Sequence, residues 1–157
     1  MWSAACYGRD VTRRVLRRAL VVEPNLARLL LLQQLMREVA SVDGCSDFTT
    51  ARTRLLQDAP DVLMTNLRLG AHNGLHLVYL AGVSTRSIVY MEREDPLLLR
   101  EAQRAGAFVE SVERLPSSAI SYVRASLPAH DRRNCTILDR RRIPRGGRRA
   151  ADVIVLD

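Results

Sequence analysis

Short apolar runs alternate with segments of helical periodicity along most of this chain, and that alternation is its strongest structural constraint. The apolar runs cover residues 19–22, 61–65, 86–91 and 107–112, and a short further candidate precedes a turn signal at Ser41–Gly44. The helical segments cover residues 26–39, 47–58, 74–81, 96–105 and 116–127. Strands that are apolar throughout are buried on both faces, as in a parallel sheet covered by helices. The pattern therefore predicts an α/β fold, with a five-stranded parallel, doubly wound sheet between two helical layers.

Capping and stop residues support these boundaries. Asn25 precedes the first helical segment as a candidate N-cap, and Pro96 suits the first turn of the fourth. Gly82 and Gly106 follow the third and fourth segments, as expected where a helix ends. The second segment is predicted to bury one face, made of Phe48, Ala51, Leu55 and Leu56.

The charge of the chain is concentrated at its ends. All 24 basic residues are arginine, and the formal net charge is +7. Residues 1–18 and 129–157 each carry a net charge of +4, whereas residues 19–128 carry −1. We therefore predict a basic N-terminal extension (1–18), one domain (19–128) and an arginine-rich C-terminal tail (129–157). The apolar residues 152–156 make a candidate terminal strand in that tail.

Several protein classes are not supported by the composition. The apolar run Leu29–Leu32 is far below the ~20 residues of a membrane span, and no secretory signal pattern opens the chain. Cys6, Cys45 and Cys135 are too widely spaced for a metal motif or a disulfide framework. We expect a cytoplasmic protein.

Function in parallel α/β sheets gathers at the carboxyl ends of the strands. The predicted strand ends here are Glu23, Asn66, Met91 and Glu113. These four residues are the first candidates for a site.

Four motifs on this framework resemble the receiver domain of bacterial response regulators. They are LVVEP at 20–24, PDVLMTNLRLG at 60–70, NGL at 73–75 and EDPLLLREAQRAGA at 94–107. The resemblance covers residues 19–128 and implies a flavodoxin-like strand order. It also implies a switch in which a histidine kinase phosphorylates an aspartate. Magnesium, held by acidic residues, assists such a transfer by neutralising charge between the anionic nucleophile and the phosphoryl group.

This sequence departs from the receiver pattern at each chemical position. The resemblance places the phosphoacceptor at Asn66, the acidic pair at Glu23, the hydroxyl at Met91, the lysine at Glu113 and the switch aromatic at Glu110. An amide is a poor nucleophile, and one remaining acid makes a weak magnesium site. We expect no phosphorylation, no cofactor, and weak or absent magnesium binding.

Two positions leave alternatives open. Asn66 either hydrogen-bonds its own loop or serves as a permanent mimic of one signalling state. Glu23 is either a surface carboxylate at a strand end or a weak residual cation ligand.

The sequence thus predicts a non-enzymatic signalling module that acts through protein contacts, with a partner or as a homodimer. The predicted interface on the fourth helix, fifth strand and fifth helix comprises Leu97, Leu98, Glu101, Ala102, Val109, Ile120 and Val123. The alternative is an arginine-tailed nucleic-acid-binding protein that uses the domain as a scaffold. Its candidate contacts are Arg140, Arg141, Arg142, Arg145, Arg148 and Arg149.

Overall fold

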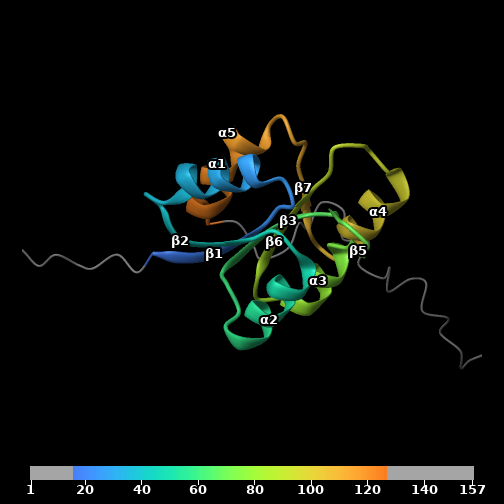
Figure 1. The fold of residues 1–157 in the computed structure, drawn as a ribbon, viewed down its shortest axis with the longest axis horizontal. Helices are drawn as coiled ribbons and strands as arrows, with labels where there is room; N and C mark the ends of the chain where they lie inside the picture. The colour runs from blue at the N-terminus through green and yellow to red at the C-terminus, as the bar shows by residue number, and fades with distance from the viewer. Residues whose placement is uncertain (1–15, 127–157) are drawn as a thin grey trace, which may run out of the picture.

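The computed structural model describes residues 16–126, which form a five-stranded parallel sheet in the order β2-β1-β3-β6-β7 (Figure 1). The strands are β1 (Arg17–Val22), β2 (Ala40–Cys45), β3 (Val62–Asn66), β6 (Arg86–Tyr90) and β7 (Phe108–Val109). The first strand lies inside the sheet, between the second and the third, as a doubly wound sheet requires. The predicted fold class is confirmed.

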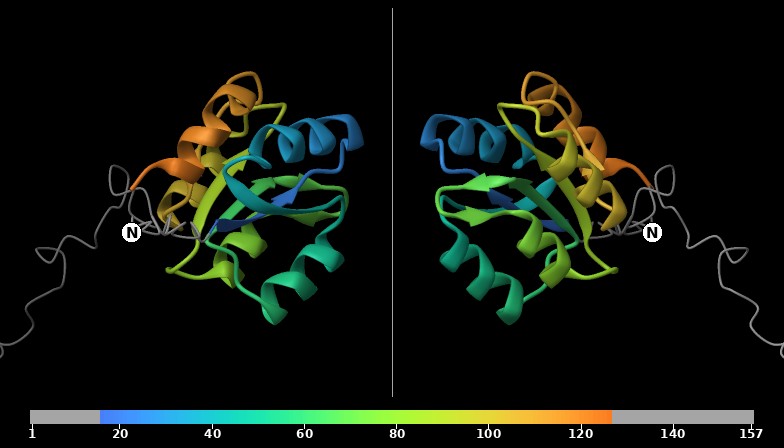
Figure 2. Two further views of the ribbon diagram at one scale, coloured as in Figure 1. Left: turned by 90° about the vertical axis from the view of Figure 1, so that its left-hand side faces the viewer. Right: turned by 90° about the vertical axis from the view of Figure 1, so that its right-hand side faces the viewer.

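Five helices cover the two faces of this sheet. They are α1 (Leu26–Met36), α2 (Phe48–Gln57), α3 (Leu75–Ala81), α4 (Pro96–Arg104) and α5 (Leu115–Arg124). Helices α1 and α5 pack together on one face, while α2, α3 and α4 follow one another on the other (Figure 2). Among residues 16–126 the longest helix has 11 residues, and none is long and apolar enough to cross a membrane.

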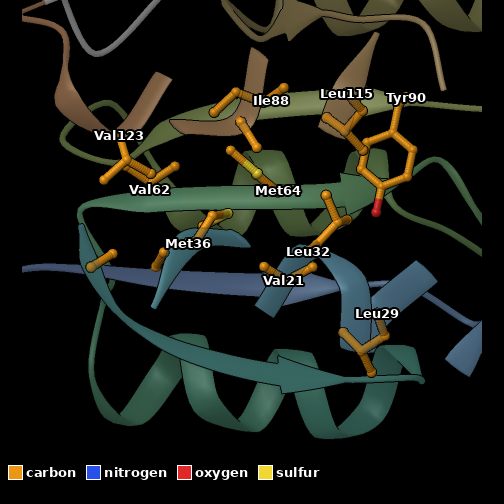
Figure 3. Packing of buried hydrophobic residues seen from close by; sticks show 13 residues of the cluster. Val21, Leu29, Leu32, Met36, Val62, Met64, Ile88, Tyr90, Leu115 and Val123 are labelled. Carbon is orange, nitrogen blue, oxygen red and sulfur yellow. The ribbon is translucent and has the colours of Figure 1, made fainter. Parts of the chain in front are cut away.

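The central strands are apolar throughout because their residues serve two cores. On β1, Ala19 and Val21 pack with α1 and α5, whereas Leu20 and Val22 pack with α2 and α3. Figure 3 shows Val21 beneath Leu32 of α1 in the first of these cores. Burial on both faces explains why these runs show no alternation of polar and apolar residues.

The predicted helix signals act as expected. The Asn25 side chain accepts the N–H of Arg28 and caps α1, and Asp95 caps α4, with Pro96 as its first residue. Gly82 and Gly106 have φ of 72° and 84°, a conformation that a side chain disfavours. Both glycines stop their helices for this reason.

Two arginines hold the carboxyl end of α5 against the amino edge of the sheet. Arg17 Nη1 donates to the carbonyl oxygens of Val123 at 2.6 Å and Ala125 at 3.0 Å. Arg86 Nη1 donates to those of Tyr122 at 2.6 Å and Ala125 at 3.1 Å. The last carbonyls of a helix have no partner within it, so these guanidinium groups satisfy part of that demand.

The turn predicted at Ser41–Gly44 is wrong, because this stretch lies in β2. Gly44 pairs in parallel register with Val21 of β1. A Cβ on Gly44 would lie 2.5 Å from Gln33 Nε2 and 3.0 Å from Leu29 Cδ1. The glycine therefore allows α1 to lie close to the edge strand, and does not mark a turn.

The loops near the carboxyl edge also differ from the prediction. The segment after β3 contains a small antiparallel hairpin of β4 (Arg68–Leu69) and β5 (His72–Asn73). Gly70, with φ of 64°, lies at its turn. The last strand has only two residues, Phe108–Val109, where the apolar run predicted residues 107–112. This strand lies at the edge of the sheet, with β6 as its one neighbour.

Smaller differences concern the ends of elements and one helix face. The sheet begins at Arg17, so the last two residues of the predicted N-terminal extension belong to β1. Helix α1 ends at Met36 and α5 at Arg124, each three residues before the predicted end. Leu56 was expected in the core, but it is exposed on α2.

Candidate functional site

Three of the predicted strand-end residues come together at the carboxyl edge of the sheet. Glu23, Asn66 and Met91 stand at or just after the ends of β1, β3 and β6, which are neighbours in the sheet. The register aligns Asn66 with Tyr90, the last residue of β6. All of these residues are buried, so their side chains form a packed cluster closed to solvent at this edge, which is named here the strand-end pocket.

Glu23 is the charged centre of this pocket. The prediction of a surface carboxylate is wrong, because its exposed fraction is 0%. Its Oε1 accepts the N–H of Asn25 at 2.8 Å, and its Oε2 lies 3.2 Å from Arg28 Nη1. A buried carboxylate is costly unless it is paired and hydrogen-bonded, and Glu23 meets both conditions.

Arg28, which the sequence pattern did not single out, links two elements across the pocket. The same Nη1 atom lies 2.7 Å from Glu92 Oε1 in the β6–α4 loop. The hydrogen bond to Glu92 is the largest cause that raises the pKa of Arg28, and Glu23 adds to it. Arg28 follows Glu23 by five residues, with the Asn25 cap between them. This spacing is the one sequence feature that could have indicated that the two side chains pair.

Asn66 makes the hydrogen bond that one of the two alternatives predicted. Its Oδ1 accepts the N–H of Arg68 at 2.9 Å, which orders the loop after β3. Its Nδ2 is buried and has no partner among the described residues. Gly74 packs so closely on the Asn66 carbonyl oxygen that a side chain there would clash. Asn66 therefore helps to shape the following loop, and whether it also mimics a signalling state stays a prediction.

Tyr90 and Met91 close the pocket on the β6 side. The Tyr90 hydroxyl lies 3.5 Å from the carbonyl oxygen of Val22. Burial is the largest cause that raises the pKa of Tyr90, followed by the charge of Glu23. Met91 presents a buried thioether where the resemblance implies a hydroxyl.

Glu113 does not join Glu23 and Asn66, although it lines a cleft together with Met91. The last strand ends at Val109, and Glu113 lies four residues beyond it, exposed in the loop before α5. Glu110, at the predicted switch position, is mostly buried; its Oε2 accepts the Tyr122 hydroxyl at 3.4 Å, and its Oε1 lies 3.8 Å from Arg114 Nε.

An acidic cleft of about 310 Å³ separates the β6–α4 and β7–α5 loops. Its charged lining consists of Glu92, Glu94, Glu110, Glu113 and Arg114. The cleft is therefore strongly acidic, and its one lining arginine is paired with Glu110.

The pocket does not fit the magnesium ion that the resemblance implies. Magnesium prefers an octahedral shell of oxygen ligands. The pocket offers the carboxylates of Glu23 and Glu92, and Arg28 already pairs with both of them. Within residues 16–126, no three His, Cys, Asp or Glu side chains form a group suited to a metal ion.

The predicted interface is only partly a surface. Ala102 and Val123 are 0% and 1% exposed, so they belong to the core and not to an interface. Leu97 is 74% exposed at the start of α4. The candidate nucleic-acid contacts in residues 140–149, and the predicted terminal strand, lie outside the described residues.

No protein-family model and no curated protein sequence matches the chain. Solved structures do match. A CheY-like response regulator receiver domain protein from Methanospirillum hungatei JF-1 has a TM-score of 0.64 and 16% identity, covering 68% of this chain and 89% of that one. A Burkholderia pseudomallei response regulator, solved with a phosphorylated aspartic acid, a calcium ion and citrate, has a TM-score of 0.62 and 18% identity, covering 69% and 67%.

The isolated REC domain of RcsB from Salmonella enterica serovar Typhimurium, solved in the presence of phosphomimetic BeF3-, also matches. Its TM-score is 0.57 and its identity 16%, covering 68% of this chain and 84% of that one. At sequence identities of 16% to 18%, the similarity to these structures shows a shared fold alone. The fold that the sequence motifs predicted, that of response-regulator receiver domains, is confirmed.

Proposed function

We propose that this chain is a receiver-like signalling module that is not phosphorylated, has no enzymatic activity and acts through protein–protein contacts. The receiver fold supports a role in signal transduction. The observation that carries the rest is Asn66, a buried neutral amide at the end of β3, with its oxygen engaged by the backbone of its own loop. Without a carboxylate at this point, no aspartyl phosphate forms there.

Phosphoryl transfer from a small donor tests this proposal. The full chain is incubated with acetyl phosphate and magnesium and then weighed by intact mass spectrometry, beside a phosphorylatable receiver as a positive control. We expect no adduct of about 80 Da, the mass a transferred phosphoryl group adds. Asn66→Asp is expected to restore little labelling, because Met91 and Glu113 supply neither the hydroxyl nor the lysine that the resemblance implies. A hydroxylamine-labile adduct on the unmodified chain would refute the proposal.

The proposed contact surface is the exposed part of the predicted interface, centred on Leu97. A leucine this exposed at the start of a helix is available to a partner or a second copy. Light scattering after size exclusion, across a concentration series, compares Leu97→Asp with Leu26→Asp. Leu26 is a suitable control because it is 64% exposed on α1, on the other face of the sheet. Association weakened by both substitutions alike would argue against this surface.

The second candidate function, nucleic-acid binding, is favoured by the eight arginines of residues 129–157. Contacts of arginine with phosphates are independent of base sequence and weaken steeply as salt rises. Replacing Arg140, Arg141 and Arg142 with serine in the full chain should lower both affinity and salt dependence. Binding to one defined sequence with little salt dependence would count against this candidate.

A further inference from the structure

The first turn of α1 carries an arginine where helix electrostatics disfavours one. Arg28 is the third residue of the helix, and the amino end of a helix repels positive charge. The side chain nevertheless turns into the pocket and is only 20% exposed. Negative charge in the pocket must therefore offset both the cost of burying the guanidinium and its repulsion by the helix dipole.

Two carboxylates from different elements supply that offset. Arg28 Nη1 lies 3.2 Å from Glu23 Oε2, at the end of β1, and 2.7 Å from Glu92 Oε1, in the β6–α4 loop. Glu23 is wholly buried, while Glu92 is half exposed. A single guanidinium nitrogen therefore bridges two anionic groups that the chain order separates by 69 residues.

The backbone around this bridge is arranged to hold it. The Asn25 N–H donates to Glu23 Oε1 at 2.8 Å, and the Arg28 N–H donates to Asn25 Oδ1 at 3.1 Å. The cap of the helix thus positions the carboxylate and the arginine together. A divalent ion approaching Glu23 would meet the guanidinium at the same oxygens.

We propose that Arg28 is the internal cation of this pocket. It takes the place of a divalent ion at Glu23 and, through Glu92, ties the start of α1 to the β6–α4 loop. This inference rests on the proposed function, which it deepens by naming the group that makes the pocket independent of metal.

The test compares Arg28→Ala with Arg93→Ala, which removes an equal charge from an exposed residue next to Glu92. Thermal unfolding of the full chains is followed by circular dichroism, with MgCl2 or MnCl2 against NaCl of equal ionic strength. The wild type and Arg93→Ala should show no cation-specific shift in Tm. Arg28→Ala should lose about 10 °C, as expected when a buried ion pair loses one partner. Divalent cation should restore roughly 3–5 °C of this loss by binding to the vacated carboxylates.

A double variant keeps the test decisive if Arg28→Ala does not fold. Adding Glu23→Gln removes the buried charge, so the double variant should fold, with much of the lost Tm recovered and no response to divalent cation. The proposal is overturned if the double variant unfolds as readily as Arg28→Ala, since Arg28 would then act by packing. It is also overturned if the wild type gains stability from magnesium, or if folded Arg28→Ala ignores it. None of these outcomes depends on phosphoryl transfer, so failure here is distinct from failure of the proposed function.

Discussion

Replacing Asn66 with aspartate would add a carboxylate to a pocket in which Arg28 already pairs with two carboxylates. Arg28 carries one positive charge and pairs with both Glu23 and Glu92, so the three groups together carry a net charge of −1. Asn66→Asp changes almost no volume and keeps an acceptor for the Arg68 N–H. Its effect on stability should therefore be electrostatic.

The size of this effect follows from the sheet. Glu23 and Asn66 end neighbouring parallel strands, which run about 4.8 Å apart, so the two carboxylates would lie roughly 6 Å from each other. At an effective dielectric constant of about 20, two like charges at that separation repel by about 3 kcal/mol. This corresponds to a pKa raised by about two units above the ordinary aspartate value of about 3.9.

The sign of the pH dependence is then determined. The unfolded chain ionises the new carboxylate near pH 4, but the folded chain ionises it only at higher pH, so the folded state binds more protons between these values. The loss of stability should be absent below about pH 4 and complete, at about 3 kcal/mol, above about pH 6.

Urea unfolding of the full chain at pH 4 and pH 7 measures the effect. Asn73→Asp is the matched control, because Asn73 Oδ1 accepts the N–H of Leu75 at 2.9 Å from a half-buried position at the end of β5. That substitution should change stability by no more than about 0.5 kcal/mol. Equal losses for the two substitutions at pH 7, or a loss at Asn66 that ignores pH, would refute this reasoning.

Two further predictions concern groups away from the pocket. Arg86→Met should lower the free energy of unfolding in urea by about 3 kcal/mol, because the charged guanidinium donates hydrogen bonds to the carbonyl oxygens of Tyr122 and Ala125. Arg100→Met changes an exposed arginine in the same way, and an equal loss for it would contradict this reasoning. Burial raises the pKa of the Cys45 thiol from 9.0 to about 11. The thiol therefore loses its proton at lower pH in the unfolded chain than in the folded one, so the free energy of unfolding should fall from pH 9 towards pH 10. The fall should be less steep in Cys45→Ala. Parallel pH profiles for the two proteins would disprove that the Cys45 thiol causes it.

The layers could be predicted from the sequence because they depend on local pattern, whereas the strand order followed from the resemblance to receiver domains. Residues 19–22 and 62–64 are apolar without interruption, which only a strand buried on both faces requires. The cap at Asn25 and the helix stop at Gly106 follow from local chemistry in the same way. The edge strand β2 was harder, because Asp43 and Gly44 are typical of turns and only the approach of α1 explains the glycine.

The sequence predicted which strand-end residues lie in the pocket, but not the contacts that they make there. Glu23, Asn66 and Met91 lie where the strand ends placed them, since adjacent parallel strands end at one edge. The ion pair of Arg28 and Glu92 could not be predicted, because it depends on how α1 and the β6–α4 loop fold over that edge. Glu113 was misplaced because β7 ends four residues before it, and nothing in the run 107–112 signals so early an end.

The hydrogen bond from Arg17 to the carbonyl oxygen of Ala125 places the beginning and the end of the described chain side by side. The two ends of the described chain, residues 16 and 126, therefore lie at the same pole of the molecule. The glutamates of the acidic cleft lie near the carboxyl ends of the strands, at the opposite pole. A partner that binds in the acidic cleft would therefore leave both ends of the described chain facing the solution on the far side of the molecule.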